Sequence, residues 1–200
     1  IVGYDIFRNH AVEIHYGRKF LRFYKPGTSK TPSRRHSVTL PLELRQNKAF
    51  LEAAVVVEGA EEVPVRLLLD TGSGDAVWLF KDEANGLPVP ETYYEEFLGQ
   101  GLSGVIYGKR TRVKQVRIGS HILENAKAAF PDMESFQGLT DLADRNGSVG
   151  GAILKRFNLF LDYPSGKITF TRNNHFSDPF HYNLAGLEVQ HAGMRYISER

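Results

Sequence analysis

The sequence predicts a mainly β protein with one or two short helices. Runs of apolar and β-prone residues, of the length of a strand, cover 50–57, 63–69 and 111–118 and are separated by glycine, proline or polar turns. Helical spacing of apolar residues is confined to two short stretches, 151–156 and 91–98. No apolar run approaches the roughly 20 residues of a membrane helix.

Composition limits the classes of function. The 200 residues are 42% hydrophobic, enough for one good core, and the net charge of +2 is too small to argue for nucleic-acid binding. There is no cysteine, so disulfides and thiolate sites are excluded. His175, His181 and His191 lack the spacing of metal ligands, and we expect neither a metal nor a cofactor. The start at Ile1, without methionine or signal peptide, suggests a processed or cropped product.

An internal repeat organises the chain. Residues 1–24 align without a gap with residues 148–171, at an offset of 147 residues. Five positions are identical, and each copy reads as a hydrophobic-Gly turn, a short helix and two strands joined by a turn; the identical pairs are Val2 and Val149, Gly3 and Gly150, Ile6 and Ile153, Tyr16 and Tyr163, and Phe23 and Phe170. We therefore interpret residues 1–24 as the C-terminal tail of a preceding lobe.

The rest of the chain divides accordingly. Residues 25–36, rich in proline, glycine and basic residues, have the composition of a linker. Residues 37–172 form a second, nearly complete lobe. Within it, 37–45 and 50–57 read as strands, and 58–62 as the turn into the strand 63–69.

The strand 63–69 ends at the most informative residue of the chain, Asp70. An aspartate at the inner end of an apolar strand is rarely buried without a partner, so it requires hydrogen-bond donors or a function. Thr71, Gly72, Ser73 and Gly74 follow it, and a second β-prone run then resumes. The glycines let backbone amides approach the carboxylate, and the two hydroxyls offer further hydrogen bonds.

The stretch Leu69 to Leu79, L-D-T-G-S-G-D-A-V-W-L, resembles the active-site motif of retropepsin-like and pepsin-like aspartic peptidases. A second family motif, the turn that closes a ψ-shaped loop, matches Val149 and Gly150. The resemblance covers 37–172 directly and 1–24 through the repeat. It implies an acid-protease lobe from a bacterial two-lobed member whose first lobe is truncated. The compartment stays open, although the resemblance favours a secreted or periplasmic one.

The resemblance also implies a mechanism. Asp70 would be one of two aspartates that activate a water for peptide-bond hydrolysis, one carboxyl acting as base and the other as acid. Thr71 would grip the opposite loop, Gly72 would leave room for it, and Ser73 would hydrogen-bond the carboxylate. The second aspartate is not in this chain, so the expected partners are a peptide or protein substrate and either the missing first lobe or a second copy.

The glycine-rich stretch 99–108 lies where such peptidases carry a flap over the substrate. We assign Gly101, Leu102, Ser103 and Gly104 to this flap; a plain surface hairpin is the alternative. A nucleotide-binding glycine loop would need a strand before it and a helix after it, and the sequence favours neither. The basic residues between 109 and 117 read as a solvated strand face.

Two other functions fit the Asp70 motif. The chain could be an inactive protease-fold module that binds a peptide or protein. The pattern D-x-G-[ST]-G also resembles the first phosphate loop of actin-like ATPases and sugar kinases, but the second phosphate loop and adenosine motif are absent. Residues 173–200 read as an extension that weakly resembles the lead-in to a PDZ-like domain.

Overall fold

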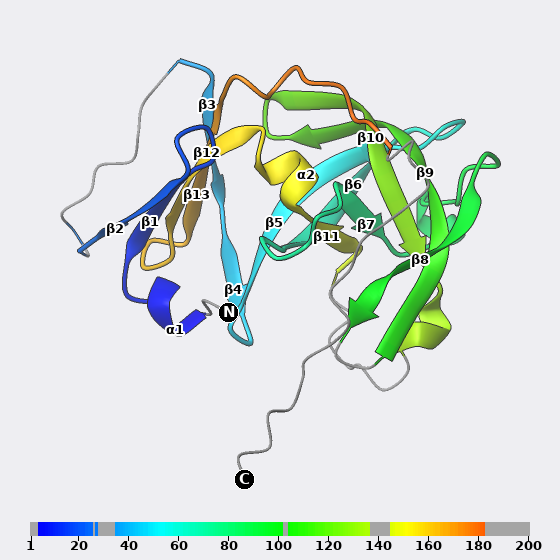
Figure 1. Ribbon diagram of the computed structural model, residues 1–200, viewed down its shortest axis with the longest axis horizontal. Coiled ribbons are helices and arrows are strands. Elements are labelled where there is room, and N and C mark those ends of the chain that lie inside the picture. The colour runs from blue at the N-terminus through cyan, green and yellow to red at the C-terminus, as the bar shows by residue number, and fades with distance from the viewer. Residues whose placement is uncertain (1–3, 26, 28–34, 102–103, 137–144, 183–200) are drawn as a thin grey trace, which may run out of the picture.

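The computed structural model describes residues 4–25, 27, 35–101, 104–136 and 145–182. It confirms a mainly β fold with two short α-helices, α1 (Tyr4–Phe7) and α2 (Gly151–Leu154). Figure 1 shows two sheets side by side, with α2 between them. The helix expected over 151–156 is therefore present as α2, which ends two residues earlier, at Leu154.

The smaller sheet has five antiparallel strands, in the order β2-β1-β12-β13-β3. Its strands are β1 (Ala11–His15), β2 (Phe20–Tyr24), β3 (Ser37–Pro41), β12 (Phe157–Asp162) and β13 (Lys167–Arg172). The two ends of the described chain thus meet in one sheet, because β1 pairs with β12.

The larger sheet has eight strands, in the order β4-β5-β6-β11-β7-β10-β9-β8. Its strands are β4 (Glu43–Arg45), β5 (Lys48–Val56), β6 (Glu62–Leu69), β7 (Val77–Leu79), β8 (Tyr94–Gly101), β9 (Gly104–Ile118), β10 (His121–Pro131) and β11 (Gly147–Val149). β5 also pairs with β9, which folds the sheet back on itself. Two 3₁₀ turns, Glu83–Asn85 and Met133–Phe136, complete the elements.

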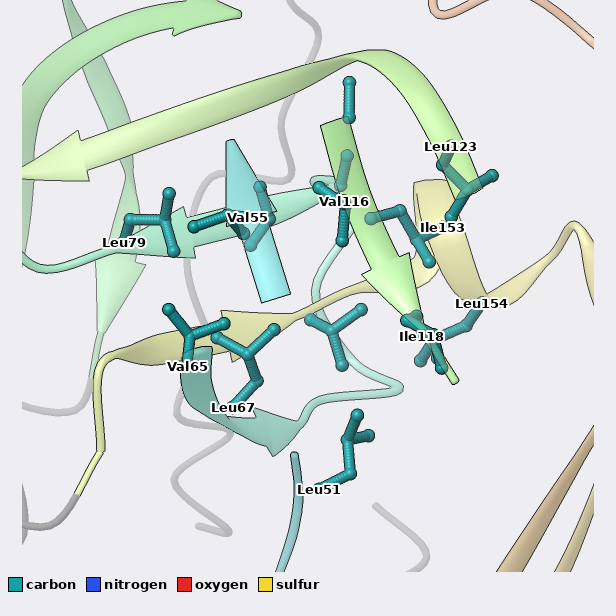
Figure 2. Packing of buried hydrophobic residues seen from close by; sticks show 14 of the residues in the cluster. Leu51, Val55, Val65, Leu67, Leu79, Val116, Ile118, Leu123, Ile153 and Leu154 are labelled. Atoms are coloured by element: carbon teal, nitrogen blue, oxygen red, sulfur yellow. The ribbon is translucent and has the colours of Figure 1, made fainter. Parts of the chain in front are cut away.

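One large hydrophobic core joins the two sheets. Leu51, Leu67 and Leu79 of the larger sheet are fully buried, as are Ile168 and Phe170 of the smaller sheet. Figure 2 shows Ile153 and Leu154 of α2 entering the same cluster beside Ile118 and Leu123. Apolar side chains on two sheets and one helix turn therefore fix the position of the segment that follows β6.

Two expected elements differ from the structure. The single strand expected over 37–45 is divided at Leu42, because β3 joins the smaller sheet and β4 the larger, and the Leu42 amide donates to Gly166 (2.8 Å). The short helix expected over 91–98 was wrong: Tyr94–Gly101 is strand β8. Its pairing with β9 and the burial of Leu98 outweigh the helical spacing.

No helix in the part of the chain that the structure describes is long and apolar enough to cross a membrane.

Candidate active site

The candidate site lies at the end of three neighbouring strands of the larger sheet. β11 lies between β6, to which it is parallel, and β7, to which it is antiparallel. Asp70 follows β6 directly, and its backbone amide donates to the Val149 carbonyl at the end of β11 (3.0 Å). The segment 70–76 and the turn after Val149 therefore lie against each other at one end of these three strands.

Backbone hydrogen bonds hold the two segments together. The Gly150 amide donates to the Ala76 carbonyl (2.9 Å), the Gly151 amide to the Ser73 carbonyl (2.7 Å) and the Ala152 amide to the Asp75 carbonyl (3.0 Å). With the Asp70 bond, the loop has four fixed attachments that are independent of its side chains. Such a loop can hold a carboxylate in a preorganised position.

Gly150 is required by this close approach. A Cβ at Gly150 would lie 2.5 Å from the Asp75 carbonyl oxygen and 3.0 Å from the Ser73 side chain. Any side chain there would separate the turn from the loop. Val149 is fully buried beside it. The structure therefore brings Val149 and Gly150 to Asp70, the two segments that the family resemblance pairs in a ψ-shaped loop.

The Asp70 carboxylate is half-buried and accepts two backbone hydrogen bonds. The amides of Gly72 (2.9 Å) and Ser73 (3.1 Å) both donate to Oδ1. The Ser73 hydroxyl is used differently from the expectation: its oxygen accepts from the Asp75 amide (3.2 Å), and the bond to Asp70 comes from the Ser73 backbone. Thr71 and Gly72 are exposed, so they lie at the surface of this lobe.

A second carboxylate of the loop, Asp75, is paired. Its Oδ2 accepts from the Trp78 indole (2.5 Å) and its Oδ1 from Arg110 Nη1 (2.5 Å). The Nε of Arg110 also donates to Glu96. Burial alone would lower the pKa of Arg110, but the neighbouring Asp75 and Glu96 carboxylates raise it, so the guanidinium stays charged.

Arg110 thereby links three elements: the Asp70 loop through Asp75, strand β8 through Glu96, and its own strand β9. The expectation that all the basic residues of this stretch are solvated was wrong for Arg110, whose side chain is 12% exposed. Sequence reasoning missed this cluster, because an arginine and two acidic residues spread over 75–110 have no characteristic spacing. The only sequence signal is that Asp75 closes the D-T-G-S-G-D run.

Strands β8 and β9 form the glycine-rich hairpin. Its last described pair is Gly101 with Gly104; Leu102 and Ser103, the expected flap tip, lie outside the described residues. A small apolar cluster of Phe80, Leu98, Ile106 and Ala129, with Trp78 packed on it, joins the hairpin to β7. Val105 and Tyr107 remain about half exposed on the hairpin.

A groove in the described part of the chain lies away from this loop. It has a volume of about 500 Å³ and is lined by Tyr93, Tyr94, Arg112 and Tyr182 among others, and it does not include Asp70. Asp70 instead occupies an open loop.

Comparison with known proteins agrees with the motif. Residues 53–145 match the family model described as aspartyl protease. Among solved structures, the chain is similar to a retropepsin-like aspartic protease from Rickettsia conorii, with 20% identity over 67% of this chain and 89% of that one and a TM-score of 0.43. The search of curated proteins gave no match.

Proposed function

We propose that this chain, a retropepsin-like aspartic peptidase lobe, hydrolyses peptide bonds with Asp70 as one of two catalytic aspartates. The observation that carries the proposal is the position of the Asp70 carboxylate. It stands at the end of β6, in which Val65 and Leu67 are buried, on a loop held by four backbone hydrogen bonds, and remains half-buried rather than enclosed.

The hydrogen bonds leave one side of the carboxylate for chemistry. Within the described residues, both bonds to Asp70 reach Oδ1. Oδ2 can then accept a hydrogen bond from a water that also contacts a second carboxyl. Two adjacent carboxyls share one proton, because both cannot ionise at low cost. One removes a proton from the water as it attacks the peptide carbonyl, and the other protonates the carbonyl oxygen.

The proposal requires a second aspartate from outside these 200 residues, since a lone carboxylate cannot serve as base and acid together. It also gives the β8–β9 hairpin the role of a flap, with Gly101 to Gly104 at its tip. The contact between the hairpin and β7 through Trp78 supports this role, because closure over substrate would then be coupled to the Asp70 loop.

The decisive experiment compares Asp70→Asn with the natural protein, including whatever its gene encodes before Ile1. The assay is cleavage of an unfolded protein from acidic to neutral pH. Asn keeps the size of the side chain but cannot exchange a proton, so we expect the rate to fall by about 10³-fold. Glu52→Gln removes a carboxyl from an exposed position of β5 and should leave the rate unchanged.

Equal cleavage by Asp70→Asn and the natural protein would refute the role of Asp70. Binding of the unfolded protein without cleavage by either would instead identify an inactive peptide-binding module.

A further inference from the structure

The helix and hairpin at each end of the described chain have the same plan. An offset of 147 residues maps α1, β1 and β2 onto α2, β12 and β13. The hairpin registers also agree, because Ala11 pairs with Tyr24 as Asn158 pairs with Thr171. Lys19 and Gly166, at equivalent turn positions, both have positive φ, of 56° and 60°.

The two units are also paired symmetrically. β1 and β12 are antiparallel, with Glu13 opposite Phe160 at the centre, and these two residues are equivalent under the offset. The flanking pairs, Ala11 with Asp162 and His15 with Asn158, exchange places under the same operation. A local two-fold axis therefore passes between Glu13 and Phe160. The sheet departs from it at one edge: β13 is paired with β3, whereas β2 is an edge strand in the described part of the chain.

The two units also differ in how far equivalent side chains are buried. Ile153, Ile168 and Phe170 are 0% exposed, because the core of residues 37–150 covers them. Their equivalents Ile6, Leu21 and Phe23 are 43%, 51% and 44% exposed. Three large apolar side chains at positions that are fully buried in one unit thus form an open apolar face in the other.

We propose that this face, formed by Ile6, Leu21 and Phe23 with the free edge of β2, is the floor of a second lobe's core. Its occupant is a body with the fold of residues 37–150, joined to the chain before Val2. A strand of that lobe equivalent to β3 extends the sheet at β2 and gives six strands. This inference deepens the proposed function, on which it rests for one point: the second lobe supplies the second aspartate.

A second copy of this chain does not fit the face. In each copy the core of residues 37–150 is already closed by its own α2, β12 and β13. Residues 4–24 could enter it only by displacing that unit. The occupant must therefore lack a closing unit of its own, and chain order gives that unit as residues 4–24. The offset places the counterpart of Asp70 about 80 residues before Ile1.

The absence of cysteine from the sequence allows single-cysteine reporters. Leu21→Cys, Ile168→Cys and Ile122→Cys are each made in the 200-residue chain and in the natural protein with whatever its gene encodes before Ile1. The rate of reaction with a water-soluble thiol reagent is then measured. Leu21 and Ile168 are equivalent under the offset, and Ile122, 45% exposed on β10, reports a surface thiol in both proteins.

In the 200-residue chain, we expect Leu21→Cys to react as fast as Ile122→Cys. Ile168→Cys should react more slowly, by a factor of roughly 10² or more. In the natural protein, Leu21→Cys should become as slow as Ile168→Cys while Ile122→Cys stays fast. Fast labelling of Leu21→Cys in both proteins, or a gene that begins near Ile1, would overturn the proposal.

Sedimentation tests the alternative occupant of this face, a second copy of the chain. A 200-residue chain that dimerises, and that Leu21→Glu converts to a monomer, would assign the face to a second copy and refute the proposal. Labelling does not depend on activity. Protection of Leu21→Cys in a protein whose Asp70→Asn variant still cleaves would therefore refute the proposed function and leave this inference standing.

Discussion

We expect the buried ring of His121 to make the stability of this lobe depend on pH. His121, 2% exposed, accepts a hydrogen bond at Nδ1 from Arg172 Nε (3.0 Å), and its ring packs against Phe157 and Phe176. Because arginine can only donate, the ring proton must lie on Nε2, 3.4 Å from the Phe170 carbonyl. Burial first, and then the charge of Arg172, lower the pKa of His121.

The unfolded chain binds a proton at His121 near its ordinary pKa of about 6.5, whereas the folded chain binds it only at lower pH. The stabilisation from the neutral ring is therefore complete above pH 6.5 and is lost as pH falls through the folded pKa. We predict that His121→Gln has a flatter dependence of unfolding free energy on pH below 6.5 than the parent, by at most about 1.4 kcal/mol per pH unit. Urea unfolding at several pH values tests this.

His181→Gln, at an exposed histidine, is the control and should keep the parent's pH dependence. An identical pH dependence in His121→Gln and the parent would contradict the argument.

At the scale of elements, the Arg110 cluster couples the Asp70 loop to the β8–β9 hairpin. Arg110→Ala would remove a charged donor from the Asp75 carboxylate, which is 17% exposed, and would leave it the hydrogen bond from the Trp78 indole. Removing one partner of a largely buried ion pair is costly because the other charge stays desolvated. We predict a loss of about 2 kcal/mol in the free energy of unfolding, measured by urea denaturation. Arg110→Lys should lose less, because it keeps the charge but not the fork that reaches both carboxylates.

The control lies on the same strand. Arg117 pairs with Glu62, but both side chains are about 40% exposed, so Arg117→Ala should cost less than about 1 kcal/mol. Equal losses for Arg110→Ala and Arg117→Ala would show that the cluster has no special role.

The sequence predicts features made by neighbouring residues better than features made by residues far apart in the chain. Asp70 could be placed at the end of a strand because the strand, the turn glycines and the carboxylate are consecutive, and Val149-Gly150 was singled out by its resemblance to a family motif. The strand β8 was mistaken for a helix because its partner β9 lies across a hairpin, and local spacing does not record pairing. The Asp75, Glu96 and Arg110 cluster joins three separate segments, so only the folded chain brings it together.

At the scale of the whole molecule, the smaller sheet combines two halves with the same design and different surroundings. Strands β12 and β13 are covered by α2 and the core of the lobe, whereas β2 repeats the apolar alternation of β13 at Leu21 and Phe23, which are 51% and 44% exposed. Equivalent residues therefore measure how much burial, rather than residue type or register, contributes to stability. Phe23 and Phe170 are the best pair because they are identical and equivalent.

We predict that Phe170→Ala and Phe23→Ala differ sharply in the 200-residue chain. Phe170 is 0% exposed and its loss leaves a cavity, so the free energy of unfolding should fall by about 3–5 kcal/mol. Phe23 is 44% exposed and its ring contacts His10, so its loss should cost no more than about 1 kcal/mol. Urea denaturation of both variants gives the comparison. Similar losses at the two positions would mean that Phe23 is already covered in solution, and that the two halves of the sheet are equally buried without a second lobe.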